Sequence, residues 1–93
     1  MTRLDVISSY IKEDEKVLDV GCDKAHLSRI LARRGIYSIA SDIHNHIIEE
    51  AKSLTNDKLK QYITFNVCDG IPNIDESEYT LVLAGMVTYT LLD

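Results

Sequence analysis

The chain has 93 residues, enough for one small domain with a modest hydrophobic core. Its 45% of hydrophobic residues and 27% of charged residues are typical of a folded protein and argue against disorder. The net charge of −5 argues against a domain whose whole surface binds nucleic acid, although a local basic patch is compatible with it.

The cysteine content and the hydrophobic runs indicate the compartment. Cys22 and Cys68 are too few for a disulfide framework, so we expect reduced thiols. No apolar run approaches the roughly 20 residues of a membrane span, and the N-terminus lacks the pattern of a signal peptide. The sequence therefore predicts a cytoplasmic protein with no membrane partner.

The first third of the chain predicts a helix, a strand and a second helix. Apolar residues at helical spacing predict a short helix within residues 3–12. Residues 17–21 are largely apolar, as in a strand that a parallel sheet buries on both faces. The helix expected over 24–34 ends with two arginines before Gly35, a residue typical of a helix C-cap.

The rest of the chain predicts further alternation of strands and helices. We expect a strand at 37–40, a helix at 44–54 and a strand of β-branched and aromatic residues at 61–67. A turn cluster at 69–73 leads, without a strong helix signal, to a fourth strand at 79–84. Alternating strands and helices predict an α/β fold with a right-handed parallel sheet.

An aspartate stands at the end of each of the first three predicted strands: Asp19, Asp42 and Asp69. The carboxyl ends of parallel strands share one edge, where ligands of open α/β sheets bind. Gly21 would let a ligand approach the backbone, and Asp42 follows it at about 20 positions, the usual interval for an acid that binds ribose hydroxyls. Asp69, beside Gly70, is suited to accept from an adenine amino group. Three acids favour S-adenosylmethionine, a cationic cofactor rich in hydroxyl and amino groups.

Other interpretations of these residues remain open. Each aspartate taken singly also fits a turn or a helix start. A dinucleotide site fits less well, because G-x-G-x-x-G is missing after Gly21 and Asp23 would face a pyrophosphate. A metal site built from His44, His46 and a cysteine matches no zinc template, so we predict no metal. Cys22 has no evident base partner and is expected to line the turn.

Three short motifs are more specific than the pattern of strand ends. They read Gly21-Cys22-Asp23-Lys24-Ala25-His26-Leu27, Cys68-Asp69-Gly70 and Leu83-Ala84-Gly85-Met86. They are similar to the G-S/T-D-H-A-Y-L, G-D-G and I-A-G-M motifs of bacterial tRNA (adenine(22)-N1)-methyltransferases. The resemblance to this family spans essentially all of the chain.

The resemblance implies a Rossmann-like class I methyltransferase fold that depends on S-adenosylmethionine. Its parallel sheet would be truncated to about four strands, in the order 3-2-1-4. Residues 1–93 would form a partial S-adenosylmethionine-binding methyltransferase domain, and the implied function is N1-methylation of an adenine in tRNA. The alternative is a non-catalytic remnant that binds the cofactor or associates with itself.

The resemblance also implies the residues of the site. The expected cofactor-binding residues, all at or just after a predicted strand end, are Asp19, Gly21, Cys22, Asp42, Ile43, Asp69, Gly70, Ala84, Gly85 and Met86. Asp23, beside the cofactor, is the candidate catalytic residue. Because N1 of adenine already carries a lone pair, we expect the site to contribute orientation and desolvation rather than a strong base.

The chain departs from the family pattern at several positions. Where the family has His, Tyr and Pro, this chain has Lys24, His26 and Ser28. Where the family has two glycines that would leave room for a flipped base, this chain has Val87-Thr88. The family's remaining strands and its C-terminal helical extension have no counterpart in these 93 residues. We therefore expect a fragment or a shortened relative.

Two contact surfaces are expected. The fourth strand, with Leu81, Val82 and Leu83, predicts an apolar edge and hence a homodimer. For tRNA, the candidate basic patch consists of Lys12, Lys16, Lys24, Arg29, Arg33 and Arg34. For this chain alone we favour the simpler interpretation that Arg33 and Arg34 are charges at a helix end.

Overall fold

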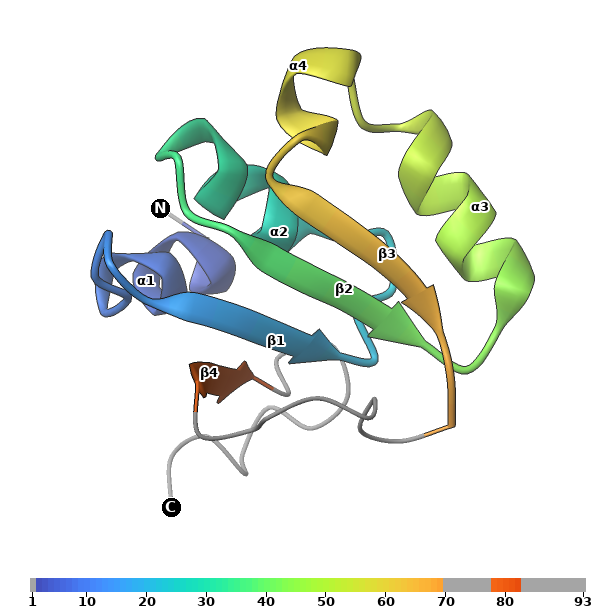
Figure 1. Cartoon of the computed structure of the whole chain (residues 1–93), viewed down its shortest axis with the longest axis horizontal. Coiled ribbons are helices and arrows are strands. Elements are labelled where there is room, and N and C mark those ends of the chain that lie inside the picture. The colour runs from blue at the N-terminus through green and yellow to red at the C-terminus, as the bar shows by residue number, and fades with distance from the viewer. Residues whose placement is uncertain (1, 70–77, 83–93) are drawn as a thin grey trace.

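The computed structural model describes residues 2–69 and 78–82. Helices and strands alternate along these residues (Figure 1). The elements are α1 (Arg3–Ser9), β1 (Lys16–Val20), α2 (His26–Arg33), β2 (Ser38–Asp42), α3 (Asn45–Ser53), α4 (Asp57–Lys60), β3 (Ile63–Val67) and β4 (Tyr79–Val82).

The four described strands form one parallel sheet in the order β3-β2-β1-β4 (Figure 1). This confirms the expected α/β fold and strand order. Asp19 lies opposite Ala40 of β2 and Val82 of β4, and Asp42 lies opposite Val67 of β3. The register therefore brings the carboxyl ends of β1, β2 and β3 to one edge of the sheet.

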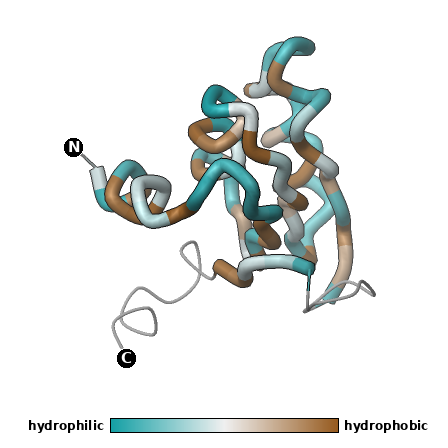
Figure 2. The backbone as a smooth tube through the Cα atoms, turned by 60° about the vertical axis from the view of Figure 1, so that its left-hand side comes forward, coloured by the Kyte–Doolittle hydropathy of each residue, from teal (hydrophilic) through white to brown (hydrophobic). Residues whose placement is uncertain are grey.

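The described helices pack against one face of the sheet. Next to β1, α1 and α2 enclose a buried cluster of Ile11, Val17, Leu27, Leu31, Ile36 and Val82. Next to β2 and β3, a second cluster contains Cys22, Ala25, Ala32, Ala40, Ile48, Ala51 and Ile63. Right-handed β1-α2-β2 and β2-α3-β3 crossovers that advance in the same direction place both helices on the same face. Along α1, hydrophobic and hydrophilic stretches alternate, as expected for a helix with one buried face (Figure 2).

The end of α2 follows the expected C-cap chemistry. Gly35 has φ +75°, which an L side chain rarely adopts. Its N–H donates to the Ala32 carbonyl at 2.9 Å, and the Ile36 N–H donates to the Leu31 carbonyl at 3.0 Å. These two bonds form a Schellman motif, so the glycine predicted to end this helix does end it.

Arg34 ties α1 to the end of α2. Its guanidinium donates to the carbonyl of Ser8 and, at 2.9 Å, to the hydroxyl of the same residue. It also donates to the carbonyl of Ile11 at 2.7 Å. It also pairs with Glu13 at 2.9 Å. Ser8 and Ile11 are buried, and the guanidinium gives their carbonyls charged donors, in addition to the Ile11 N–H that the Ser8 carbonyl accepts at 3.0 Å. Arg34 thus holds α1 in its position beside the sheet.

The structure differs from the expected boundaries in a few places. No helix was predicted between the expected helix at 44–54 and the expected strand at 61–67, but this segment contains α4. Its first turn is capped by the Asn56 side chain, which accepts from the Leu59 N–H at 2.9 Å. A single turn is too short to show helical periodicity. β2 extends to Asp42 because its pairing with β3 continues to that residue. In the described ranges, no helix has the length and apolar character needed to cross a membrane.

Replacing Arg34 tests its role in holding α1. We expect Arg34→Ala to lower the free energy of unfolding by about 2–3 kcal/mol, because buried carbonyls lose charged donors. The neighbouring change Arg33→Ala removes an exposed arginine and should cost less than about 0.5 kcal/mol. Urea denaturation followed by circular dichroism measures both, and equal losses would show that Arg34 holds nothing.

Candidate cofactor site

The loop between β1 and α2 has an unusual backbone. Gly21, Asp23 and Ala25 have φ of 68°, 52° and 59°, in the left-handed region. For the two residues that carry a Cβ, this conformation costs about 1–2 kcal/mol each. The loop is held by the Cys22 N–H, which donates to the Ser41 carbonyl at 2.9 Å, and by the Ala25 N–H, which donates to the Cys22 carbonyl at 2.8 Å. Such strain is commonly kept where a loop must present groups to a ligand.

The first turn of α2 is open to a ligand. Among the described residues, no side chain caps this helix, and its first turn carries no acidic residue. The amide N–H groups that begin a helix carry partial positive charge and have no intrahelical acceptors. The strained loop therefore ends in hydrogen-bond donors at the same edge of the sheet as Asp19.

Asp19 is the central group of the site. Its side chain is 3% exposed, and within the described residues its Oδ1 atom is buried without a hydrogen-bond partner. Burial and, as the smaller cause, the negative charge of Asp42 together raise the pKa of Asp19 to about 7. A buried, unpartnered carboxylate is costly in a folded protein, so this atom indicates a ligand that donates hydrogen bonds or carries positive charge.

A cavity of about 220 Å³ opens onto this carboxylate. It is lined by Arg3, Leu4, Asp19, Cys22, Asp23, His26 and Leu27. The structure thus brings together three of the predicted site residues, Asp19, Cys22 and Asp23, and adds residues from α1. Arg3 and Leu4 were not among the predicted site residues, because nothing in their spacing shows which strand end a helix will cover.

Asp42 ends β2 beside this cavity. Its Oδ1 accepts from the His44 N–H at 3.0 Å and lies 3.2 Å from Nδ1 of the same residue. Both contacts use one oxygen, which leaves Oδ2 for a ligand. The carboxyl side chain is 11% exposed, whereas the next residue, Ile43, is a largely exposed apolar side chain. A polar acceptor beside an apolar surface suits a ribose joined to a flat base.

The strand ends of β2 and β3 are joined beyond the sheet. The Cys68 N–H donates to the Asp42 carbonyl at 3.0 Å, and the Ser41 hydroxyl lies 3.2 Å from the Cys68 sulfur. Asp69 follows as an exposed residue two positions after β3 and does not line the cavity. Four predicted site residues lie outside the described residues: Gly70, Ala84, Gly85 and Met86.

Cys22 lines the cavity as a thiol. Burial raises its pKa to about 12, and the negative charges of Asp19, Asp42 and Asp23 act in the same direction. Because the thiolate is the nucleophilic form, Cys22 is inert at neutral pH. His44 and His46 stack obliquely with ring centroids 5.5 Å apart, and no set of three possible metal-binding side chains occurs within residues 2–69 and 78–82.

The raised pKa of Asp19 predicts how stability depends on pH. Between about pH 4 and pH 7 the folded chain binds a proton at Asp19 that the unfolded chain has released. The free energy of unfolding should therefore fall as the pH rises through this range.

Asp19→Asn should remove that dependence and stabilise the ligand-free chain at pH 8 by about 2–4 kcal/mol. Thermal melting at pH 5 and pH 8 measures it, with the exposed Asp14→Asn as the matched control. If Asp19→Asn and Asp14→Asn shift the melting temperature alike at pH 8, then Asp19 is not a buried charge.

Comparison with known proteins agrees with this geometry. A family described as "Methyltransferase domain" matches residues 1–93. A candidate tRNA (m1A22) methyltransferase of Streptococcus pneumoniae has 27% sequence identity and a TM-score of 0.69, over 84% of this chain and 36% of its own. The resemblance read from the motifs is thereby supported. None of the curated proteins matches the chain.

Two further solved structures share the fold at lower identity. An uncharacterized protein of Listeria monocytogenes serotype 4b has 22% identity and a TM-score of 0.70, over 84% of this chain and 35% of its own. A TehB-like SAM-dependent methyltransferase of Corynebacterium glutamicum has 21% identity and a TM-score of 0.58, over 71% of this chain and 33% of its own. The chain thus spans about a third of each. It belongs to the methyltransferase-domain family, in its class I Rossmann-like form, with S-adenosylmethionine as cofactor.

Proposed function

We propose that residues 1–93 form the cofactor-binding part of a methyltransferase that acts on N1 of an adenine in tRNA. The observation that carries the proposal is the buried, unpartnered Oδ1 of Asp19 at a cavity beside a second carboxylate, Asp42. The tRNA substrate is supported by the 27% identity to the pneumococcal protein. A cytoplasmic location belongs to the same proposal.

The residues present fit the parts of S-adenosylmethionine. Asp19 would accept hydrogen bonds from the ammonium group, and the open first turn of α2 would bind the carboxylate. Asp42 would bind ribose hydroxyls through Oδ2, and Ile43 would pack against the adenine ring. Asp69 is proposed to bind the adenine amino group, and Cys22 is small enough to form the cavity wall.

Four further residues are part of the proposed site although they lie outside the described residues. Gly70 would lie beside the adenine amino group, and Ala84, Gly85 and Met86 would form the floor near the target base. These roles follow from the resemblance to the tRNA (adenine(22)-N1)-methyltransferase motifs.

Methyl transfer to N1 of adenine would need little acid–base catalysis by the protein. The cofactor supplies an electrophilic methyl group on a sulfonium. N1 of adenine has an unprotonated lone pair, so this chain's residues need only hold the two reactants in line and exclude water. Asp23, exposed at the cavity wall, is proposed to position the target base by accepting a hydrogen bond from its amino group.

Titration with S-adenosylhomocysteine tests the cofactor site. We expect the 93-residue chain to bind it, and Asp42→Ala to weaken binding by about tenfold or more, because the ribose loses a charged acceptor. Isothermal titration calorimetry measures both. Asp57→Ala, which removes an exposed carboxylate on α4, is the matched control and should bind like the unchanged chain.

The outcomes separate two functions. Binding that Asp42→Ala weakens and Asp57→Ala does not supports the cofactor site and justifies an assay of methyl transfer to tRNA. A folded chain that does not bind S-adenosylhomocysteine contradicts the proposal and favours a non-catalytic module that works through association.

Self-association is the second candidate function, and the edge of β4 favours it. Within the described residues, β4 is the last strand of the sheet, and its outer side pairs with no other strand. Leu81 on this strand is 47% exposed. Exposed apolar edge strands pair readily with a second chain. We therefore propose a homodimer through the β4 edge.

Charge on the edge strand should abolish such a dimer. We expect the unchanged chain to sediment as a concentration-dependent dimer in analytical ultracentrifugation, and Leu81→Lys to sediment as a monomer. Leu54→Lys, at an equally exposed leucine that ends α3, is the control. A monomer at every concentration, or a dimer that Leu81→Lys leaves unchanged, would contradict this edge as the interface.

A further inference from the structure

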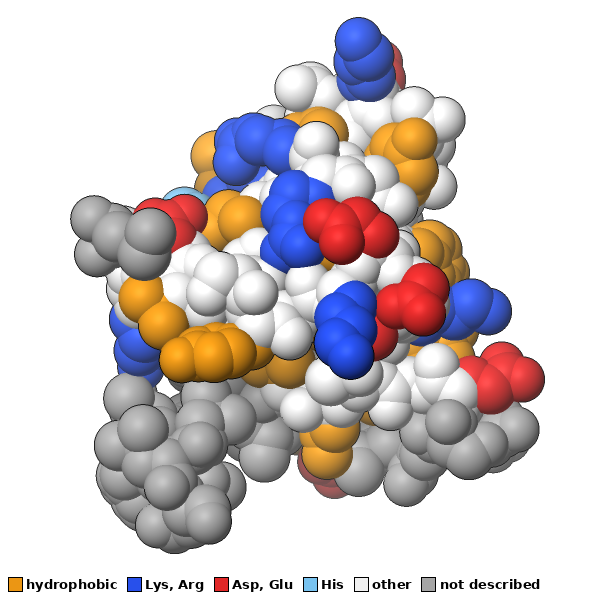
Figure 3. Space-filling view, turned by 90° about the vertical axis from the view of Figure 1, so that its left-hand side faces the viewer, with side chains coloured by type: hydrophobic (Ala, Val, Ile, Leu, Met, Phe, Trp, Pro, Cys, Tyr) orange, Lys and Arg blue, Asp and Glu red, His pale blue; other side chains and the backbone are white. Residues whose placement is uncertain are grey.

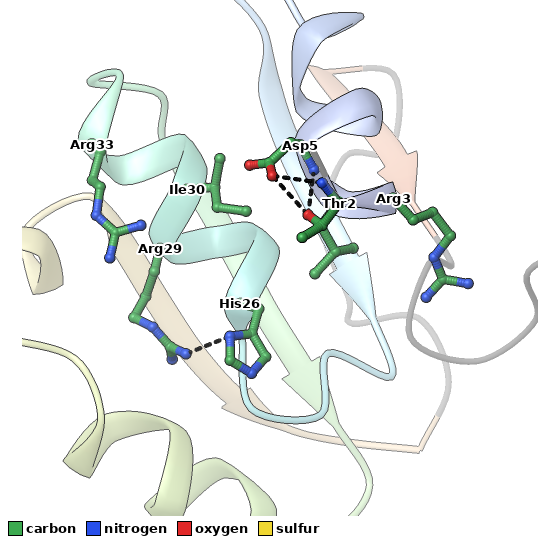
Figure 4. A pocket seen from close by; sticks show the side chains of 8 residues that line it. Thr2, Arg3, Asp5, His26, Arg29, Ile30 and Arg33 are labelled. Atoms are coloured by element: carbon green, nitrogen blue, oxygen red, sulfur yellow. Dashed lines mark hydrogen bonds between the residues drawn. The ribbon is translucent and has the colours of Figure 1, made fainter.

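A second hollow lies between α1 and α2, directly beside the cofactor cavity. This groove has a volume of about 700 Å³ and shares three lining residues with the cavity: Arg3, Leu4 and His26. Figure 4 shows Ile30 of α2 on the side that faces Thr2 and Asp5, and Arg29 and Arg33 along the other side of the same helix. A ligand in the groove would therefore lie next to Asp23 and the cofactor.

The Arg29 side chain lies on the basic side of the groove and is held there by hydrogen bonds. It is 8% exposed, and its guanidinium donates to the Lys24 carbonyl. It also lies 2.9 Å from Nδ1 of His26 (Figure 4). Because an arginine can only donate, Nδ1 of His26 accepts, and the ring proton sits on Nε2, which is left to donate to a ligand. Arg29 and His26 thus hold each other in place in the groove, whereas Arg33 is exposed.

Within residues 2–69 and 78–82, no carboxylate pairs with the arginines of this side. Burial lowers the pKa of Arg29, and the positive charge of Arg33 lowers it further, so the two guanidinium groups repel each other. Among the described residues neither arginine forms an ion pair with a carboxylate. Several other cations lie against acids, as Figure 3 shows on one face and as Lys24–Glu50 and Arg34–Glu13 illustrate.

The one acid in the groove offsets only part of this charge, because three arginines line the groove with it. Asp5 is the only carboxylate among the residues that line it, and its Oδ2 accepts from the N–H of Thr2 at 2.9 Å and from its hydroxyl at 2.8 Å. These bonds form the capping box of α1 and turn the carboxylate toward its own helix. Two crowded arginines in an open groove therefore indicate an anionic ligand.

We propose that the groove between α1 and α2 binds the sugar–phosphate backbone of the RNA substrate, beside the cofactor cavity. The inference rests on the proposed function and specifies the surface that the substrate uses. Arginine binds phosphate oxygens through two parallel hydrogen bonds, and Ile30 offers an apolar wall to a sugar or base. A groove of this volume is far larger than one phosphate needs, which favours a strand over a single ion.

The structure also changes the interpretation of the basic patch. Of its six predicted members, Lys24 pairs with Glu50 at 3.8 Å and Arg34 is committed to Ser8, Ile11 and Glu13. Arg29 and Arg33 line the groove and carry no carboxylate partner in the described part of the chain. Arg33 does lie in the last turn of α2, as expected for a charge at a helix end, and the proposal gives it a second role.

Charge reversal at Arg33 tests the proposal. Fluorescence anisotropy of a labelled tRNA transcript, titrated with the 93-residue chain at several salt concentrations, measures the affinity. We expect Arg33→Glu to weaken binding by about tenfold and to reduce the salt slope by about 1. Lys58→Glu is matched, because Lys58 is an exposed cation in the last turn of another helix, α4, and it should change the affinity by less than about twofold.

The readouts distinguish this proposal from the cofactor site. Both variants should bind S-adenosylhomocysteine like the unchanged chain, because neither residue lines the cofactor cavity. A chain that binds S-adenosylhomocysteine but not tRNA overturns the groove and leaves the cofactor site standing. Equal loss of tRNA affinity in Arg33→Glu and Lys58→Glu overturns it too, since binding would then follow net charge alone.

Two further measurements address an unfolded variant and a different class of acidic ligand. If Arg33→Glu unfolds, which circular dichroism detects, Arg33→Gln replaces it and should still weaken tRNA binding several-fold. Polyglutamate serves as a competitor for an acidic protein segment. If it displaces tRNA at equal charge concentration, the groove recognises acidic chains in general, and the assignment to RNA is wrong.

Discussion

The buried carboxylate of Asp19 constrains everything around it. A carboxyl group that is 3% exposed, with an unpartnered oxygen and a second carboxylate nearby, opposes folding at neutral pH. An asparagine would fit the same space at lower cost. In the proposed site, a ligand with an ammonium group offsets this charge, so a feature that opposes folding would be one that favours binding.

In the proposed site, the same carboxylate would couple cofactor binding to the release of a proton. With a pKa of about 7, Asp19 is partly protonated at neutral pH before the cofactor binds and must be ionised to hold an ammonium group. Binding therefore releases protons near neutrality, and the proton competes with the cofactor as the pH falls below 7. Asp42 contributes to this competition, since its charge opposes the ionisation of Asp19, and a bound cation relieves both.

Part of this site could be read from the sequence because short patterns determine it. A buried parallel strand with an acid near its end needs only a few consecutive residues, so the positions of Asp19 and Asp42 followed from local rules. Gly35 likewise marks the end of α2 through a single required φ angle. The boundaries shifted by one or two residues where pairing between distant strands decided them, as at Asp42.

Other parts depend on contacts between residues far apart in the chain. Arg34 reaches across 26 positions to Ser8 and sets where α1 lies, and only then do Arg3 and Leu4 border the cavity. The division of the basic residues into paired and unneutralised ones has the same origin. Lys24 and Arg33 look alike in sequence, but only the tertiary fold places a glutamate beside the first.

The adjacent acidic cavity and basic groove suit the proposed reaction, in which a positive charge would move from the cofactor to the adenine. Before transfer, the sulfonium adds to the attraction that Asp19 and Asp42 exert on the cofactor. After transfer, that charge resides on the methylated adenine, so the spent cofactor has lost part of its attraction to the two carboxylates. The modified base has meanwhile become a cation near the arginines of the groove. Both changes favour release of products, and they arise from the placement of opposite charges on the two sides of Leu4 and His26, which border both hollows.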